Sequence, residues 1–139
     1  SRHSSLRLSL QMKQSRALLA SNLLTGAVAV VLILAGALKL IDLGADDMIE
    51  GLEKANLIQH RTLISITAIV CGVLLLVPLT KRFGFLMASA YWGGAIVAHL
   101  TYNDSFLMPA AFLTILWLGV VLQSKPFQLL DRAASSDDT

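Results

Sequence analysis

The feature that most constrains the fold is a stretch of more than twenty largely uncharged residues, from about Ala17 to Leu40. A helix rises about 1.5 Å per residue, so this stretch is long enough to cross the roughly 30 Å of hydrocarbon in a bilayer. Three more apolar stretches follow, at about 58–79, 83–102 and 106–122. Only 14% of the residues are charged, whereas a soluble domain carries about a quarter. We therefore expect an integral membrane protein.

The four apolar stretches predict an all-α fold, a transmembrane four-helix bundle. In the only long polar connection, 42–59, Met48 and Leu52 follow helical spacing opposite several acids. We expect a short amphipathic helix at the outer membrane interface between the first two spans, with Asp46 or Asp47 as its cap and its apolar face covering the bundle. The acids lack the spacing of a calcium loop, so we expect a solvated face rather than a cation site.

The distribution of basic residues predicts the domain limits and the orientation. Residues 1–16 contain no acid and are typical of a basic cytoplasmic extension at the lipid surface, or of a processed targeting segment. Residues 17–124 form the expected bundle, and 125–139 a polar tail. Because basic loops stay in the cytoplasm, we expect both termini there, in a bacterial cytoplasmic (inner) membrane. The basic side chains on that side are Arg2, Arg7, Lys13, Arg16, Lys81, Arg82, Lys125 and Arg132.

This topology brings polar groups from three spans to the same depth in the outer leaflet. Lys39 ends the first span, His60 and Arg61 begin the second, and His99 and Tyr102 close the third. Ionisable groups inside a membrane are costly and often functional. We therefore take this level as the candidate ligand-binding site.

The third span carries two further candidates for that site. Tyr91, His99 and Tyr102 share one helical face, and Trp92 lies close to it. His99 either holds two helices together through a hydrogen bond or lines a pocket in which it binds or relays a proton to an amphipathic ligand. For Tyr91 and Trp92, core packing is the alternative to ligand contact.

Lys39 also has two interpretations. In one, its side chain reaches the interface and pairs with Asp42, three residues on. In the other, Lys39 faces the bundle interior and continues an inward stripe of small and polar residues, Ser21, Thr25 and Gly36.

Two sets of small residues predict close helix packing. Ala68 and Gly72 form a small-xxx-small pair in the second span. Ala90, Gly94 and Ala98 form a similar seam in the third span, along which another helix can approach closely.

Several kinds of chemistry are disfavoured. The single cysteine, Cys71, excludes a Cys-x-x-Cys redox pair and a disulfide-relay enzyme. We expect no metal site, because His60 and His99 lack further ligands at matched depth other than Asp104 and the loop acids. We also find no nucleophile elbow, phosphate loop or nucleic-acid patch, and we expect no activity as an enzyme on its own.

Three short motifs resemble those of the DoxX-like family of small four-span membrane proteins. They are the first-span end at 36–40 with Lys39, the 74–78 run that ends at a proline, and the 91–100 run with His99. The resemblance covers roughly 24–122 and implies a four-helix membrane bundle, with Lys39 and His99 on matching family positions.

The family is functionally mixed. Its namesake is similar to a small subunit of an archaeal thiosulfate:quinone oxidoreductase, other members resemble partners in redox or stress pathways, and animal relatives resemble receptor-assembly chaperones. Where many members carry an acidic residue in the second span, this chain has Thr67-Ala68, which weakens any claim of a proton-relaying carboxylate there.

Two functions are compatible with these features. The first is an accessory or ligand-binding subunit, linked to a membrane redox system, with an outer-leaflet polar pocket for a quinone-like or lipid-like molecule. The second is a non-catalytic interaction or assembly protein whose small-residue seams dock another membrane protein or a second copy of the chain. In either case we expect membrane lipids as partners and no nucleic acid.

Overall fold

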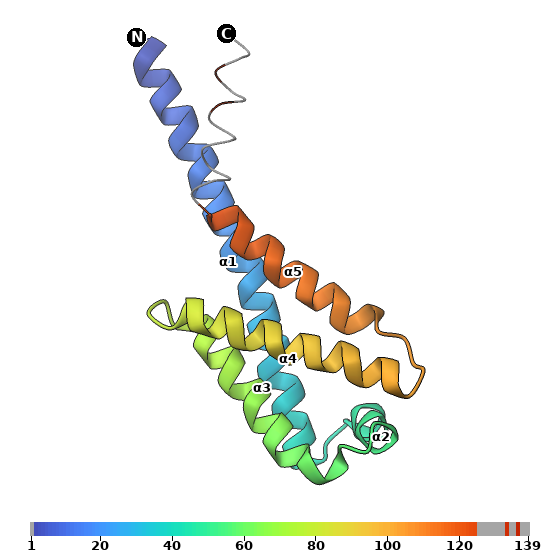
Figure 1. Ribbon diagram of the computed structural model, residues 1–139. Coiled ribbons are helices and arrows are strands. Elements are labelled where there is room, and N and C mark those ends of the chain that lie inside the picture. Colours follow the sequence, from blue (N-terminus) through green and yellow to red (C-terminus); the bar gives the residue numbers. More distant parts are fainter. Residues whose placement is uncertain (1, 125–132, 134–135, 137–139) are drawn as a thin grey trace.

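The computed structural model describes residues 2–124, 133 and 136. Within these residues the chain is all-helical and contains no strand, which confirms the expected all-α class. The predicted tail at 125–139 lies outside the described residues, apart from positions 133 and 136. The elements are α1 (Arg2–Ile41), α2 (Asp46–Lys54), the short 3-10 helix η1 (Ile58–His60), α3 (Arg61–Leu76), α4 (Lys81–Thr101) and α5 (Leu107–Gln123), as shown in Figure 1.

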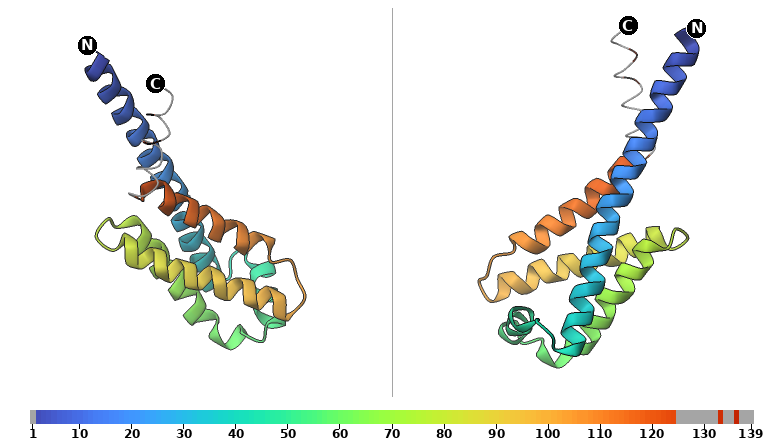
Figure 2. Two further views of the ribbon diagram at one scale, coloured as in Figure 1. Left: turned by 45° about the horizontal axis from the view of Figure 1, so that its top comes forward. Right: turned by 180° about the vertical axis from the view of Figure 1, so that it is seen from behind.

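Helix α1 is much longer than the apolar stretch that predicted it. It runs for 40 residues, so the basic segment at 2–16 continues the same helix without a break. No Pro or Gly interrupts this segment, and three of its serine hydroxyls, on Ser5, Ser9 and Ser15, donate to carbonyls one turn back. Figures 1 and 2 show this end of α1 projecting beyond the other helices.

The limits of the remaining helices follow local rules. Helix α3 ends at Leu76, earlier than the predicted limit near residue 79, because Val77 is extended (ψ 120°) and precedes Pro78. Helices α1, α2 and α4 are each followed within two residues by a residue with left-handed backbone: Asp42, Asn56 and Asn103, with φ between 57° and 58°. Asp and Asn tolerate this conformation better than other non-glycine residues.

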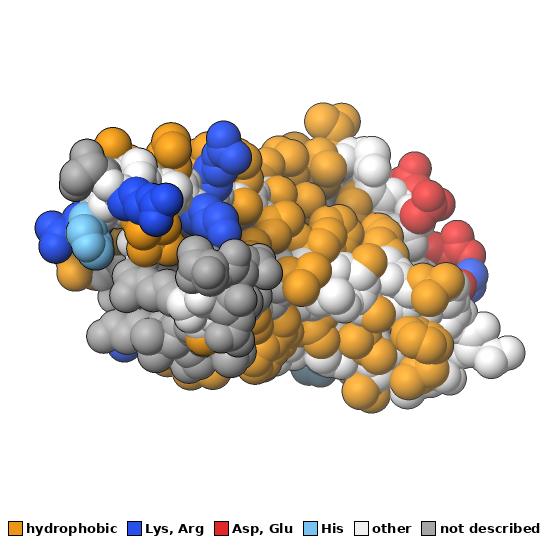
Figure 3. Space-filling model, turned by 90° about the horizontal axis from the view of Figure 1, so that it is seen from above, with side chains coloured by type: hydrophobic (Ala, Val, Ile, Leu, Met, Phe, Trp, Pro, Cys, Tyr) orange, Lys and Arg blue, Asp and Glu red, His pale blue; other side chains and the backbone are white. Residues whose placement is uncertain are grey.

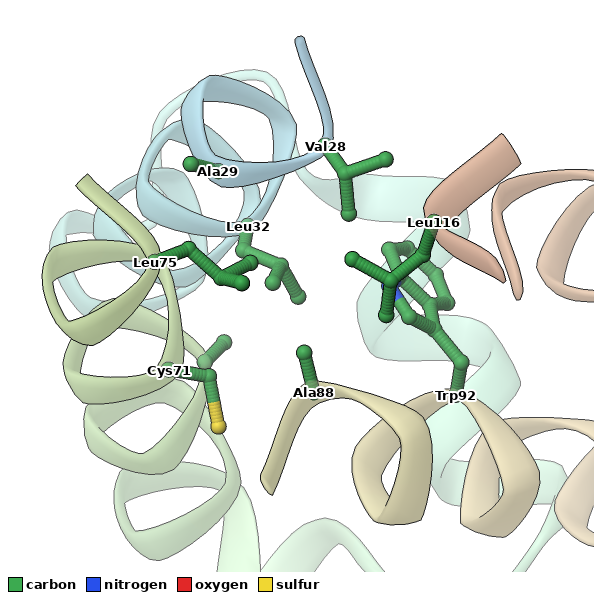
Figure 4. Close-up of a cluster of buried hydrophobic side chains, with 9 residues drawn as sticks. Val28, Ala29, Leu32, Cys71, Leu75, Ala88, Trp92 and Leu116 are labelled. Carbon is green, nitrogen blue, oxygen red and sulfur yellow. The ribbon is translucent and has the colours of Figure 1, made fainter. Parts of the chain in front are cut away.

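The four longer helices α1, α3, α4 and α5 pack in a ring, in which α1 and α4 each contact α3 and α5. All four contribute side chains to one buried apolar core (Figure 4). Its members are Val28, Ala29, Leu32, Ala68, Cys71, Leu75, Ala88, Trp92 and Leu116.

Small residues set the closest contacts of α1. A Cβ built on Gly72 of α3 would lie 2.7 Å from the Ala29 carbonyl oxygen, and one built on Gly36 would lie 2.6 Å from the Ser65 carbonyl oxygen. On the α5 side, the buried Ser21 hydroxyl donates to the Gly119 carbonyl. The inward stripe predicted for α1 is therefore the face that α3 and α5 cover.

Within the described part of the chain, three helical stretches are long and apolar enough to cross a membrane: Arg2–Ile41, Ile58–Leu76 and Lys81–Thr101. The fourth expected span corresponds to α5, which is apolar but has only 17 residues.

The connection between α1 and α3 contains the expected short helix, α2. Met48 and Leu52 on one face are half-buried, whereas the acidic side chains are exposed. The cap differs from the expectation: Ala45 occupies the N-cap position, no side chain caps the helix, and Asp46 and Asp47 lie in its first turn. There their charges still complement the positive end of the helix.

Candidate functional site

A cavity of about 950 Å³ lies between the end of α1, helix α2, the second half of α4 and the start of α5. Its walls are mostly apolar, with polar groups from α1, α2 and α4 among them. All of the predicted ligand-binding residues except Arg61 line it. They are Lys39, His60, Tyr91, Trp92, His99 and Tyr102.

Lys39 faces inward and contacts α4. Its side chain comes from the last turn of α1, the residue is 6% exposed, and its ammonium donates to the Tyr91 hydroxyl at 3.0 Å. The same ammonium lies 5.8 Å from the centre of the Tyr91 ring, within reach of a cation–π interaction. Of the two interpretations of Lys39, the inward-facing one describes the structure.

Arg61 makes the ion pair with Asp42 that was expected of Lys39. Its guanidinium lies 3.0 Å from the Asp42 carboxylate, and its Nε donates to the Lys39 carbonyl at 2.7 Å. Asp42 therefore pairs with Arg61 and not with Lys39. Because Arg61 binds the backbone just behind Lys39 and does not line the cavity, its contacts hold the end of α1 against the start of α3.

The His99 ring contacts two polar side chains that follow it in the chain. Its Nδ1 lies 3.0 Å from the Tyr102 hydroxyl and 3.5 Å from an Asp104 carboxylate oxygen. The left-handed residue Asn103 makes this arrangement possible, because the turn brings the Asp104 amide to the His99 carbonyl at 3.0 Å. These contacts at Nδ1 fix the orientation of the imidazole ring. Within residues 2–124, we find no hydrogen-bond partner for Nε2.

Helix α2 forms the wall of the cavity next to Tyr102. Gly51 allows its backbone to come close, since a Cβ at this position would lie 3.3 Å from the Tyr102 hydroxyl. On the exposed side of α2, Lys54 and Glu50 form an ion pair at 2.7 Å. The hydrogen bond and the charge of Glu50 raise the pKa of Lys54, so this lysine stays protonated.

Trp92 belongs both to the core and to the cavity wall. It is 8% exposed and stacks on Phe112 of α5, with ring centroids 5.0 Å apart. Tyr91 meets the Trp92 ring edge-on at 5.6 Å. Trp92 therefore fixes the distance between α4 and α5 beside the cavity.

His60 contributes least to the site. It ends η1, lines the cavity and is exposed to solvent. Within the described part of the chain, no group of three or more His, Cys, Asp or Glu side chains is placed to hold a metal ion.

The two small-residue sets have different surroundings. Ala68 and Gly72 face α1, where Ala68 is fully buried. No helix within residues 2–124 approaches Gly94: a Cβ there would meet nothing within 4 Å. Ala90, Gly94 and Ala98 instead line the cavity. Helix α4 packs through its buried residues Gly84, Ala88 and Trp92. These lie on nearly the opposite side of the helix from Gly94, because residues two positions apart, such as Trp92 and Gly94, point in directions about 200° apart around the helix axis.

No protein-family model matches this chain, and neither a curated protein nor a solved structure is significantly similar to it. The resemblance to the DoxX-like family stays a prediction.

Sequence reasoning missed the cavity residues on α1 and α5. Val31, Leu34 and Leu38 on α1 and Phe112 on α5 look like ordinary apolar residues of a span, and nothing in their spacing marks a cavity. The sequence did indicate that α2 contributes to the cavity wall. Its apolar face, which includes Met48 and Leu52, was expected to cover the bundle, and both residues line the cavity.

Proposed function

We propose that the protein is an integral membrane protein, a DoxX-like four-helix bundle, that binds a quinone-like or lipid-like molecule in the cavity and acts as an accessory subunit of a membrane redox system. The observation that carries the proposal is the cavity itself. Its volume is about 950 Å³, at the upper end of the roughly 300–1,000 Å³ typical of ligand pockets. Apolar walls with a few convergent polar groups are the usual composition of such sites.

The polar groups suit an amphipathic ligand. Lys39 and Tyr91 offer a cation and a hydroxyl at one part of the wall, and His99 with Asp104 offers an imidazole that can exchange a proton at another. The ligand's apolar part would lie against Trp92 and Phe112.

The same proposal includes a membrane arrangement. Helix α5, with 17 residues, lies at the lower limit of the roughly 17–25 residues that cross a bilayer, so we propose it as the fourth span, with α2 at the outer interface. Figure 3 supports the orientation: Lys and Arg gather near the N-terminal end, whereas Asp and Glu gather at the opposite end. We infer that both termini lie in the cytoplasm of a bacterial cell, following the bias of basic residues.

Filling the cavity tests this function. Gly94 lines the cavity and Gly93 does not, and a Cβ at either position meets nothing within 4 Å. We expect Gly94→Leu to reduce the amphipathic molecules that co-purify with the protein by about tenfold or more, measured by solvent extraction and mass spectrometry. Leucine favours a helix over glycine by about 0.8–1 kcal/mol, so neither Gly94→Leu nor the matched control Gly93→Leu should unfold the chain.

His99→Ala gives a second measurement. We expect it to weaken retention of the same molecules while α4 stays folded. If extraction of the wild-type protein yields no bound molecule, and His99→Ala changes only thermal stability, the ligand-binding function is wrong.

An assembly protein is the second candidate, favoured by the absence of any helix of residues 2–124 close to Gly94. A helix of another subunit, or of a second copy, would then fill this space. Gly94→Leu should in that case dissociate the complex, and Gly93→Leu should not. An unchanged oligomer in both variants would rule this function out.

A further inference from the structure

Among residues 2–124, the buried ammonium of Lys39 has no counter-ion. The residue is 6% exposed, and among residues 2–124 the only hydrogen-bond partner of its ammonium is the neutral Tyr91 hydroxyl. The nearest acid in sequence, Asp42, is paired with Arg61. The other ion pairs of the described residues join Lys54 to Glu50 and His99 to Asp104.

The surroundings of Lys39 offset only part of the cost of burying it. The carbonyl end of α1 and the Tyr91 ring both favour a cation. These are partial charges, whereas a buried ammonium needs a full opposite charge or several acceptors to replace its lost water. An ammonium has three N–H donors, and one of them is used by Tyr91.

The cavity offers room for the missing anion and for an apolar chain attached to it. Lys39 lies on the cavity wall, and the wall continues along α1 through Leu34 to Val31. Val31 and Lys39 are eight positions apart, a distance of about 12 Å along the helix axis. An elongated chain can therefore lie along α1 while its head group stays at Lys39.

The acids of the cavity do not replace this anion. Asp47, Glu50 and Asp104 line it but are exposed to solvent. Glu50 already binds Lys54, and Asp104 lies beside His99. Charges in water are screened, whereas a buried charge acts strongly on a ligand beside it.

We infer that the cavity binds a long-chain amphiphile with an anionic head group, a carboxylate or a phosphate, which pairs with the Lys39 ammonium beside Tyr91. The inference rests on the proposed ligand-binding function and specifies the ligand class. It favours a charged lipid-like molecule over a neutral quinone-like one.

Quenching of Trp92 fluorescence tests the inference. Trp92 lines the cavity, whereas the only other tryptophan, Trp117, lies outside it against Phe85. In a Trp117→Phe protein in nanodiscs, Trp92 is therefore the sole reporter. The probes share one brominated chain: 9,10-dibromostearate, the corresponding alkyl phosphate, and the corresponding neutral alcohol.

We expect one or both anionic probes to quench Trp92 saturably at a concentration about tenfold lower than the alcohol, the effect of one charge-assisted hydrogen bond. The probe with the stronger quenching distinguishes carboxylate from phosphate. Lys39→Met should abolish the difference from the alcohol, and Lys39→Arg should keep it. If Lys39→Met does not fold, the comparison of probes on the Lys39 protein still decides.

Equal quenching by the alcohol and the anions would overturn the anionic ligand and leave the proposed ligand-binding function intact. A preference for anions that persists in Lys39→Met would also overturn it. A combined negative result would overturn both the inference and the proposed function. In that case no probe quenches Trp92 saturably, and Gly94→Leu and Gly93→Leu retain as much co-purifying amphipathic material as the parent protein.

Discussion

At the scale of single residues, the site depends on a few side chains whose partners are distant in the sequence. Lys39 and Tyr91 are 52 positions apart and in hydrogen-bond contact. Arg61 fixes the backbone at Lys39, because its guanidinium binds both the Lys39 carbonyl and the Asp42 carboxylate. These contacts hold the end of α1 against α3 while the Lys39 side chain points inward to Tyr91.

Asn103 provides a prediction at this scale. Its φ of 57° lies in the left-handed region, where a β-branched residue is strained by about 1–2 kcal/mol. We expect Asn103→Val to lower the free energy of unfolding by about that amount, measured by thermal or denaturant unfolding in detergent. Asn103→Gly is the control, because glycine accepts this backbone freely. Its free energy of unfolding should stay within a few tenths of a kcal/mol of the wild-type value. Equal stability of the Val and Gly variants would contradict this account of the turn.

At the scale of elements, two seams of small residues look alike in the sequence and have different surroundings. The seam on α3 lies against α1. The seam on α4 lines the cavity, while Gly84 and Ala88 make the contact with neighbouring helices. Small-residue spacing predicts a close approach, but it does not predict which side of the helix is used.

Gly72 provides the prediction at this scale. A side chain there would meet the Ala29 carbonyl oxygen at 2.7 Å, so the helices α1 and α3 must separate to admit it. We expect Gly72→Leu to destabilise the protein by about 1–3 kcal/mol. Gly26→Leu is the matched control, because a Cβ at Gly26 meets nothing within 4 Å and leucine favours the helix. Thermal unfolding of both variants measures the difference.

At the scale of the whole molecule, most Lys and Arg on the face that Figure 3 shows gather toward one side, and Asp and Glu gather toward the other. The proposed topology has a direct test, because the only cysteine, Cys71, is fully buried and should react slowly. Single cysteines at exposed Glu53 and Ser9 probe opposite ends.

We expect a membrane-impermeant maleimide to label Glu53→Cys in intact bacterial spheroplasts, and to label Ser9→Cys only after the membrane is permeabilised. The unsubstituted protein gives the background. Labelling of Ser9→Cys in intact spheroplasts would contradict a cytoplasmic N-terminus.

The helical class, the approximate positions of the helices and the candidate polar residues were all predictable from the amino-acid sequence. These follow from local properties: the length of an apolar run, the place of Pro78, and the polar groups at the ends of spans. The face of α1 that packs against other helices was also predictable, because Ser21, Thr25 and Gly36 repeat at helical spacing.

The directions in which the candidate side chains point depend on how the helices pack together. Sequence reasoning brought Lys39, His99 and Tyr102 to one depth, but depth does not determine direction. The packing of α1 on α3 turned Lys39 toward Tyr91, and the packing of α4 through Gly84 and Ala88 left Gly94 facing a cavity. Several helices together line such a cavity, so no single stretch of sequence contains it.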